Sequence, residues 1–121
     1  MMKVLIIDDA VFMRTAIKSF LIKNGFEDIV EAQNGLEGLQ KYKELRPDVV
    51  TMDITMPDMD GLEALKAIIA FDPNAKVIMV TAMGKEVMVK DAIMLGAKSF
   101  IVKPFKEDQV VNTIKKLLNI A

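Results

Sequence analysis

Five residues whose side chains could take part in chemistry stand at the ends of apolar runs: Asp8, Asp9, Asp53, Thr81 and Lys103. Short apolar runs that stop at turn residues are typical of strands buried within a sheet. Asp is disfavoured inside strands, so a carboxylate at the tip of a run needs a reason. It either caps a turn or is a reactive or metal-binding group. The run that ends at Asp53 leaves both explanations open when it is considered alone.

Composition narrows the chemistry that these residues could perform. The 121-residue chain has 16 basic and 17 acidic residues, so no basic field attracts nucleic acid or an anionic membrane, and we expect neither as a partner. Cysteine and histidine are both absent, which excludes thiol chemistry, an imidazole base and the commonest zinc ligand. Any bound metal must therefore be held by oxygen ligands. The first apolar run, residues 4–7, is too short for a signal peptide or membrane span, so we expect a cytoplasmic protein.

Five apolar runs alternate with five amphipathic segments. Strands are expected at residues 3–7, 28–32, 49–53, 76–81 and 99–102. Helices are expected where apolar residues recur with helical spacing, over 13–21, 36–45, 62–69, 85–95 and 110–118. Asn34 and Asp60 stand where they could cap two of these helices. Gly38 lies inside the second helix, where it costs roughly 1 kcal/mol relative to Ala with no visible local gain.

The alternation predicts an α/β fold, a doubly wound parallel sheet with helices on both faces. Ligands of such sheets bind beyond the carboxyl ends of the strands. In the order 2-1-3-4-5, the first and third strands are neighbours about 5 Å apart. Asp8, Asp9 and Asp53 would then lie together, with Thr81 and Lys103 approaching from the far side.

Three carboxylates at such short range repel one another and raise one another's pKa values. A divalent cation removes the conflict, and Mg²⁺ fits best because it prefers oxygen ligands and pairs with phosphate. Asp53 beside such a cation is a candidate nucleophile for a phosphoryl group. The resulting dianion would attract Lys103 and Thr81 and move the loops that follow them. The same residues would therefore make a switch.

The same positions carry a resemblance to response-regulator receiver domains that covers essentially the whole chain. The matching motifs are VLIIDD at 4–9, MDITMPDMDG at 52–61, TAMG at 81–84 and GAKSFIVKPF at 96–105. The resemblance implies a flavodoxin-like (βα)5 fold with strand order 2-1-3-4-5. It also implies one receiver domain over residues 1–121 without an output domain, and a binding module rather than a metabolic enzyme.

The resemblance assigns roles in phosphorylation. Asp53 looks like the phosphoacceptor, and Asp8, Asp9, Asp53 and the backbone carbonyl of Thr55 look like the Mg²⁺ ligands. Thr55 and Met83 correspond to positions that flank the hydrolytic water in this family. Met83 cannot orient a water molecule by hydrogen bonding, which predicts slow loss of the phosphate.

The resemblance also assigns roles in switching. Thr81 and Lys103 resemble the hydroxyl and ammonium groups that sense the phosphoryl group. Phe100 occupies the position of the aromatic switch residue, and without a hydroxyl it must act by packing alone. The Lys103–Pro104 peptide bond is expected to be cis, an isomer that only proline tolerates readily.

Partners follow from the same resemblance, which within the family is closest to chemotaxis receivers of archaea and deep-branching bacteria. They are a sensor histidine kinase and a downstream motor or motor-adaptor protein, with the receiver acting as a monomer. The output face would comprise the fourth helix, the fifth strand and the fifth helix. The fourth helix, 85–95, has apolar residues around most of its circumference. Either all of these apolar side chains are buried against the sheet and neighbouring helices, or some stay exposed and contact a partner.

Three other functions compete with this interpretation. A stand-alone receiver could also serve as a phosphorelay intermediate. A Mg²⁺-dependent phosphohydrolase of the haloacid-dehalogenase type would need a second Asp where Thr55 stands. A flavodoxin-like flavin carrier shares the strand order, but Asp8 and Asp9 would repel the phosphate of the flavin.

Overall fold

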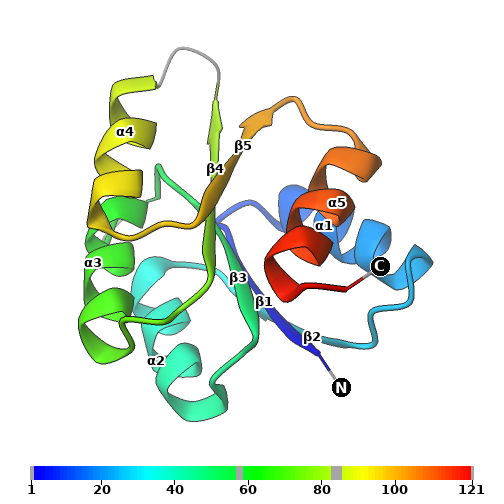
Figure 1. Cartoon of the computed structure of the whole chain (residues 1–121), viewed down its shortest axis with the longest axis horizontal. Helices are drawn as coiled ribbons and strands as arrows, with labels where there is room; N and C mark the ends of the chain where they lie inside the picture. Colours follow the sequence, from blue (N-terminus) through cyan, green and yellow to red (C-terminus); the bar gives the residue numbers. More distant parts are fainter. Residues whose placement is uncertain (1, 57–58, 83–85, 121) are drawn as a thin grey trace.

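The computed structural model describes residues 2–56, 59–82 and 86–120. Over these residues five strands alternate with five helices (Figure 1). The elements are β1 (Lys3–Ile7), α1 (Val11–Lys23), β2 (Asp28–Ala32), α2 (Gly35–Leu45), β3 (Val49–Asp53), α3 (Gly61–Phe71), β4 (Val77–Ala82), α4 (Glu86–Leu95), β5 (Ser99–Lys103) and α5 (Glu107–Leu118). Every expected element is present, and the strand ends agree with the sequence prediction to within one residue.

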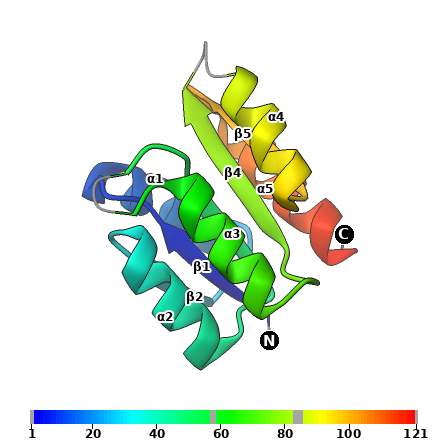
Figure 2. The same ribbon diagram turned by 90° about the vertical axis from the view of Figure 1, so that its left-hand side faces the viewer.

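The strands form one parallel sheet in the order β2-β1-β3-β4-β5, as predicted. Helices α2, α3 and α4 cover one face and α1 and α5 cover the other (Figures 1 and 2). Because all five strands run in the same direction, their carboxyl ends lie along one edge. The register pairs Asp53 with Val80 and Lys103 with Ala82, so β5 extends two residues of β4 beyond the level of Asp53.

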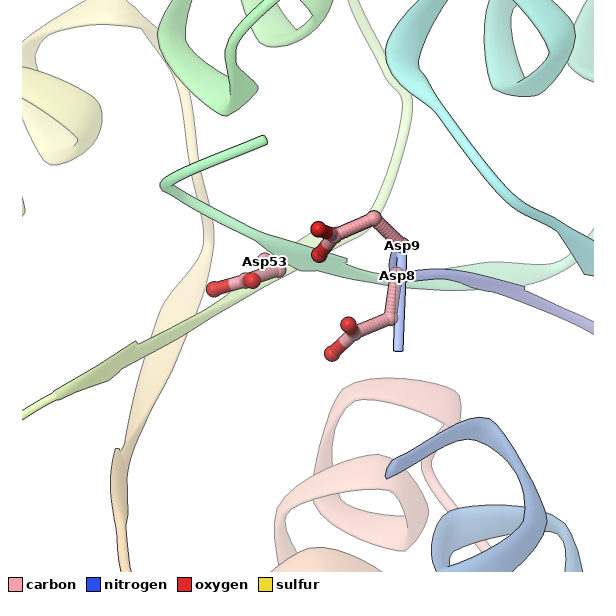
Figure 3. Close-up of side chains that lie close together, drawn as sticks. All are labelled: Asp8, Asp9 and Asp53. Carbon is pink, nitrogen blue, oxygen red and sulfur yellow. The ribbon is translucent and has the colours of Figure 1, made fainter. Parts of the chain in front are cut away.

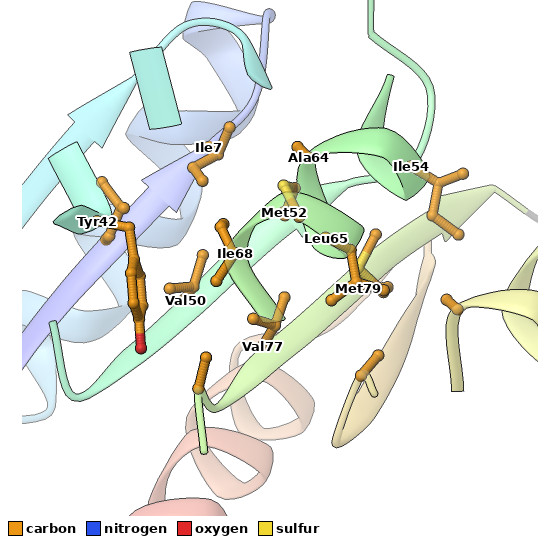
Figure 4. Packing of buried hydrophobic residues seen from close by; sticks show 14 of the residues in the cluster. Ile7, Tyr42, Val50, Met52, Ile54, Ala64, Leu65, Ile68, Val77 and Met79 are labelled. Carbon is orange, nitrogen blue, oxygen red and sulfur yellow. The ribbon is translucent and has the colours of Figure 1, made fainter. Parts of the chain in front are cut away.

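The sheet divides the aliphatic interior into two cores. Side chains alternate along β1, with Leu5 and Ile7 on the α2–α3–α4 side and Val4 and Ile6 on the α1–α5 side. Figure 4 shows the first core, which includes Val50, Met52, Leu65, Ile68 and Met79. The continuous apolar runs of the central strands follow from burial on both faces.

The helix starts follow the predicted capping pattern. The Asn34 side chain accepts a hydrogen bond from the Glu37 amide at 2.8 Å, and Asp60 accepts one from the Glu63 amide at 2.9 Å. Both residues satisfy amides that the first turn of a helix leaves unpaired. None of the described helices combines the length and the apolar character needed to span a membrane.

Gly38 is favourable because of a tertiary contact between α2 and β1, which the sequence around Gly38 does not reveal. A methyl group built on Gly38 would overlap Cδ1 of Ile7 and lie 2.9 Å from its Cγ1 and 3.1 Å from its Cγ2, and the Ile7 side chain is itself buried. Glycine therefore allows α2 to approach β1 closely. This close approach offsets the lower helix propensity of glycine.

Candidate functional site

Three carboxylates meet at the carboxyl edge of the sheet. Asp8 and Asp9 are the first two residues after β1, and Asp53 is the last residue of β3. Each offers one oxygen within 4.8 Å of the oxygens offered by the other two. Figure 3 shows the three side chains, which extend into the same space beyond the strand ends. Asp8 and Asp53 are buried and Asp9 is exposed, so the cluster opens to solvent on the side of Asp9.

The turn after β1 holds Asp8 by its main chain and its carboxylate. The amide of Asp8 donates to the carbonyl of Ala32 on β2 at 3.1 Å. The amide of Ala10 donates to Oδ1 of Asp8 at 2.9 Å, which fixes the carboxylate and leaves Oδ2 to face the site. The carbonyl of Asp8 accepts a 2.6 Å hydrogen bond from the guanidinium of Arg14 on α1.

Asp53 is held by the loop that returns to α3. The Thr55 backbone amide lowers the pKa of Asp53, and the amide of Gly61 donates to the carbonyl of Ile54 at 2.6 Å. A methyl group on Gly61 would lie 2.6 Å from Cα of Ile54, so only glycine permits this contact. The first residue of α3 thus rests directly against the end of β3.

Lys103 supplies the positive charge of the site. Its Nζ lies 3.5 Å from Oδ1 of Asp53 and 3.8 Å from Oδ2 of Asp8. Three carboxylates and one ammonium leave an excess of negative charge, which a divalent cation with oxygen ligands would neutralise. The three carboxylates therefore form an acidic pocket that could bind a metal ion, and their oxygen ligands are of the kind that Mg²⁺ prefers.

Burial raises the pKa of both buried carboxyl groups. Loss of solvation is the main cause of the raised pKa of Asp8, which the Ala10 amide and the Lys103 charge oppose. For Asp53 loss of solvation again comes first, followed by repulsion from Asp8, so its pKa also lies above the ordinary value. The Lys103 charge lowers the pKa of Asp53 but does not cancel these effects.

Of the remaining predicted residues, Thr81 lies on β4 and Phe100 lies on β5. Thr81 is buried, and its hydroxyl donates to the carbonyl of Ala82 at 3.3 Å. Phe100, on the edge strand β5, is 45% exposed. The Lys103–Pro104 peptide bond is cis, as expected. Met83 and Pro57 lie outside the described residues, and so does Lys85, the first residue of the predicted fourth helix.

Some of the apolar side chains of helix α4 remain exposed to solvent. Ala92 is buried, and Met88, Val89 and Leu95 pack partly into the core. Exposed apolar side chains remain on the helix and on the neighbouring edge strand: Val87, Ile93, Met94, Phe100 and Val102.

Arg14 is a site residue that sequence reasoning missed. It lies on the polar face of α1, where an arginine is ordinarily only a solvated charge. A sequence signal exists only in hindsight, because Arg14 stands one helical turn after the first residues of α1 and faces the turn it supports.

Comparisons with known proteins identify the family of the chain. The response regulator receiver domain model matches residues 4–115, and the chain belongs to this family. The chain is 60% identical over 116 residues to the chemotaxis protein CheY of Listeria monocytogenes, covering 96% of this chain and 98% of that protein. It is 55% identical over 115 residues to CheY of Thermotoga maritima, covering 95% of this chain and 96% of that protein.

A solved structure agrees with the same assignment. The crystal structure of the CheX–CheY–BeF3–Mg complex from Borrelia burgdorferi contains a chain that matches with a TM-score of 0.91 and 44% identity, covering 97% of this chain and 89% of that one. The chain is therefore a receiver domain of the CheY type. Receiver domains of this type are signalling proteins and not enzymes in the ordinary sense.

Proposed function

We propose that the chain is a phosphorylation-dependent switch in chemotaxis or motility control. It accepts a phosphoryl group on Asp53 from a CheA-like sensor histidine kinase, with Mg²⁺ bound, and changes its affinity for a downstream motor or motor-adaptor protein. The observation that carries this proposal is the convergence of Asp8, Asp9 and Asp53 beside Lys103. The chain acts as a monomeric receiver in the cytoplasm, where the kinase makes its phosphohistidine.

The reaction is a displacement at phosphorus. An oxygen of the Asp53 carboxylate attacks the phosphoryl group, the bond between phosphorus and the donor nitrogen breaks, and the imidazole leaves with that electron pair. Asp8, Asp9, Asp53 and the carbonyl of Thr55 would hold Mg²⁺, which offsets negative charge on the phosphoryl oxygens. Lys103, already 3.5 Å from Asp53, would pair with the same oxygens. Asp53 must be ionised to attack, which the Lys103 charge favours.

The switch follows from the charge that phosphorylation adds. A phosphoryl group on Asp53 replaces a single negative charge with a group that carries more charge and several acceptor oxygens. The hydroxyl of Thr81 now makes only a long hydrogen bond to the neighbouring carbonyl, so it can turn toward the phosphoryl oxygens at little cost. Movement of Thr81 at the end of β4 would open space for the half-exposed ring of Phe100 to move inward by packing.

The output surface would be the α4–β5–α5 face. Its exposed Val87, Met94, Phe100 and Val102 give an adaptable apolar surface on which a partner can distinguish two positions of Phe100. Shifting a two-state equilibrium almost completely takes about 5.5 kcal/mol of differential affinity. A few rearranged apolar contacts are enough to provide a large part of this differential affinity.

The kinase would dock in an apolar groove beside α1. A groove of about 460 Å³ lies between α1 and the segment after β5, and it is lined by Phe12, Met13, Ala16, Phe20, Lys103, Pro104 and Phe105. Phe20 and Phe105 pack edge to face at 6.2 Å, while Phe12 is 79% exposed. This apolar groove borders Lys103, so a donor protein seated on it would have its phosphohistidine close to Asp53.

Phosphotransfer from a kinase tests the proposal. An autophosphorylated chemotaxis histidine kinase should transfer its phosphoryl group to the wild-type chain in Mg²⁺ but not to Asp53→Asn. Phe12→Ala should slow transfer from the kinase while leaving the rate with acetyl phosphate unchanged. Transfer to Asp53→Asn at the wild-type rate would overturn the assignment of Asp53. Onward transfer from the chain to a histidine phosphotransfer domain would instead identify a phosphorelay intermediate.

A further inference from the structure

Arg14 links the turn that carries the acidic pair to an edge strand of the sheet. Its Nη1 donates to the carbonyl of Asp8 at 2.6 Å, and its Nε lies 3.1 Å from Oε1 of Glu31 on β2. The Arg14 side chain is only 12% exposed although it begins on the polar face of α1. One guanidinium therefore connects three elements: helix α1, the end of β1 and strand β2.

Glu31 is itself fixed and so sets the direction of the guanidinium. Its other carboxylate oxygen lies 3.5 Å from Nζ of Lys18, and its backbone carbonyl accepts a hydrogen bond from Lys41 on α2. Because the five N–H groups of arginine lie in one plane, fixing Nε fixes the position of Nη1 as well. The Asp8 carbonyl thus receives its hydrogen bond from a donor whose position is already determined.

Arg14 adds to the support that the start of α1 gives this turn. Ala10, the residue at the N-cap of α1, has no side-chain cap, and its amide is used to hold Oδ1 of Asp8. The contact of Arg14 is with main chain, so it orders the turn without occupying a carboxylate oxygen that a metal would use. Mg²⁺ demands nearly ideal octahedral geometry, which makes its affinity sensitive to small displacements of its ligands.

We propose that Arg14, oriented by Glu31, is a positioning residue that sets the Mg²⁺ affinity of the Asp8–Asp9–Asp53 site. This inference rests on the proposed function, in which those three carboxylates bind Mg²⁺. Removal of a group that supports metal ligands commonly lowers metal affinity by roughly 10- to 100-fold. Arg14→Met should therefore weaken Mg²⁺ binding roughly tenfold.

The direction in which Mg²⁺ affinity changes when Arg14 is replaced distinguishes a positioning role from an electrostatic one. Arg14 is a cation near a site for a dication, so removal of its charge alone would strengthen Mg²⁺ binding. A positioning role predicts weaker binding instead. Lys18→Met is the matched control, because Lys18 shares Glu31 and the same helix but has no contact with Asp8.

The experiment is a calorimetric titration of Mg²⁺ into the unphosphorylated wild type, Arg14→Met, Arg14→Lys, Glu31→Gln and Lys18→Met. Urea unfolding in EDTA checks that each variant is folded. We expect Arg14→Met to bind roughly tenfold more weakly and Arg14→Lys to recover the affinity only in part, because lysine lacks the planar fork. Glu31→Gln keeps an acceptor oxygen for Nε, so it and Lys18→Met should bind with nearly wild-type affinity.

Folded Arg14→Met with wild-type or tighter Mg²⁺ binding would overturn the inference. Should Arg14→Met not fold, Glu31→Ala provides the test, because it removes the acceptor that orients Arg14, and wild-type affinity in that variant would overturn the inference equally. A wild-type chain that binds no Mg²⁺ would contradict the proposed function itself.

Discussion

At the scale of single residues, Asp53 is held in an environment that costs free energy until charge is neutralised. It is buried, it faces two other carboxylates, and Lys103 is its nearest cation among the described residues. Such strain is common where a residue is kept for reaction rather than for stability. Mg²⁺ would supply the positive charge that the three carboxylates, and still more a phosphoryl group on Asp53, require.

We propose that the side chains of Met83 and Thr55 set the lifetime of the phosphorylated state. A carboxylate introduced as Met83→Glu can orient the attacking water, which methionine cannot. Loss of the phosphoryl group should accelerate roughly three- to tenfold, below the 100-fold and more of a fully developed general base. The decay of phosphorylated protein after removal of the donor measures this, with Met83→Gln as an uncharged comparison. A slower or unchanged decay in Met83→Glu would rule out the explanation.

At the scale of elements, the α2–β1 contact explains a glycine inside a helix. Gly38→Ala should gain helix propensity of roughly 1 kcal/mol and lose more than that by overlap with Ile7, for a net loss of about 1–2 kcal/mol. Equilibrium urea unfolding measures the net change in the free energy of unfolding.

A double-mutant cycle with Ile7→Val separates the two contributions. Valine lacks the terminal methyl group of isoleucine, so Gly38→Ala should be better tolerated in the Ile7→Val background than in the wild type. Equal destabilisation in both backgrounds would show that the Ile7 contact is not the reason for Gly38.

The site could be predicted from the sequence where topology alone brings residues together. Asp8, Asp53 and Lys103 each end a strand, and parallel strands in a known order place these ends along one edge. Arg14 and Gly38 could not be predicted in this way, because their partners Glu31 and Ile7 are remote in sequence and are met only through packing. The exposure of α4 was also open, since its apolar residues lie on all sides and only the packed structure shows which ones face solvent.

At the scale of the whole molecule, the site connects stability to pH and metal. Because burial raises the pKa of Asp8 and Asp53, the metal-free native state binds protons more tightly than the unfolded chain does. Stability of the metal-free protein should therefore fall as pH rises through these raised pKa values. It should recover as pH falls toward the ordinary value of 3.8.

Comparison with Asp53→Asn isolates this effect from other titrating groups. In EDTA at pH 8 the variant should be more stable than the wild type by about 1 kcal/mol, and this advantage should vanish near pH 4. Saturating Mg²⁺ should stabilise the wild type more than the variant, because the variant has lost a ligand. An advantage of Asp53→Asn that persists unchanged at pH 4 would exclude the ionised Asp53 carboxylate as its cause.

The mass of the intact protein after incubation with acetyl phosphate and Mg²⁺, followed by peptide mapping, tests directly whether Asp53 is the phosphoacceptor. We expect one added phosphoryl group on Asp53 of the wild type, and none in Asp53→Asn or in the presence of EDTA. A phosphoryl group on another residue, or one that forms equally well without Mg²⁺, would contradict this expectation.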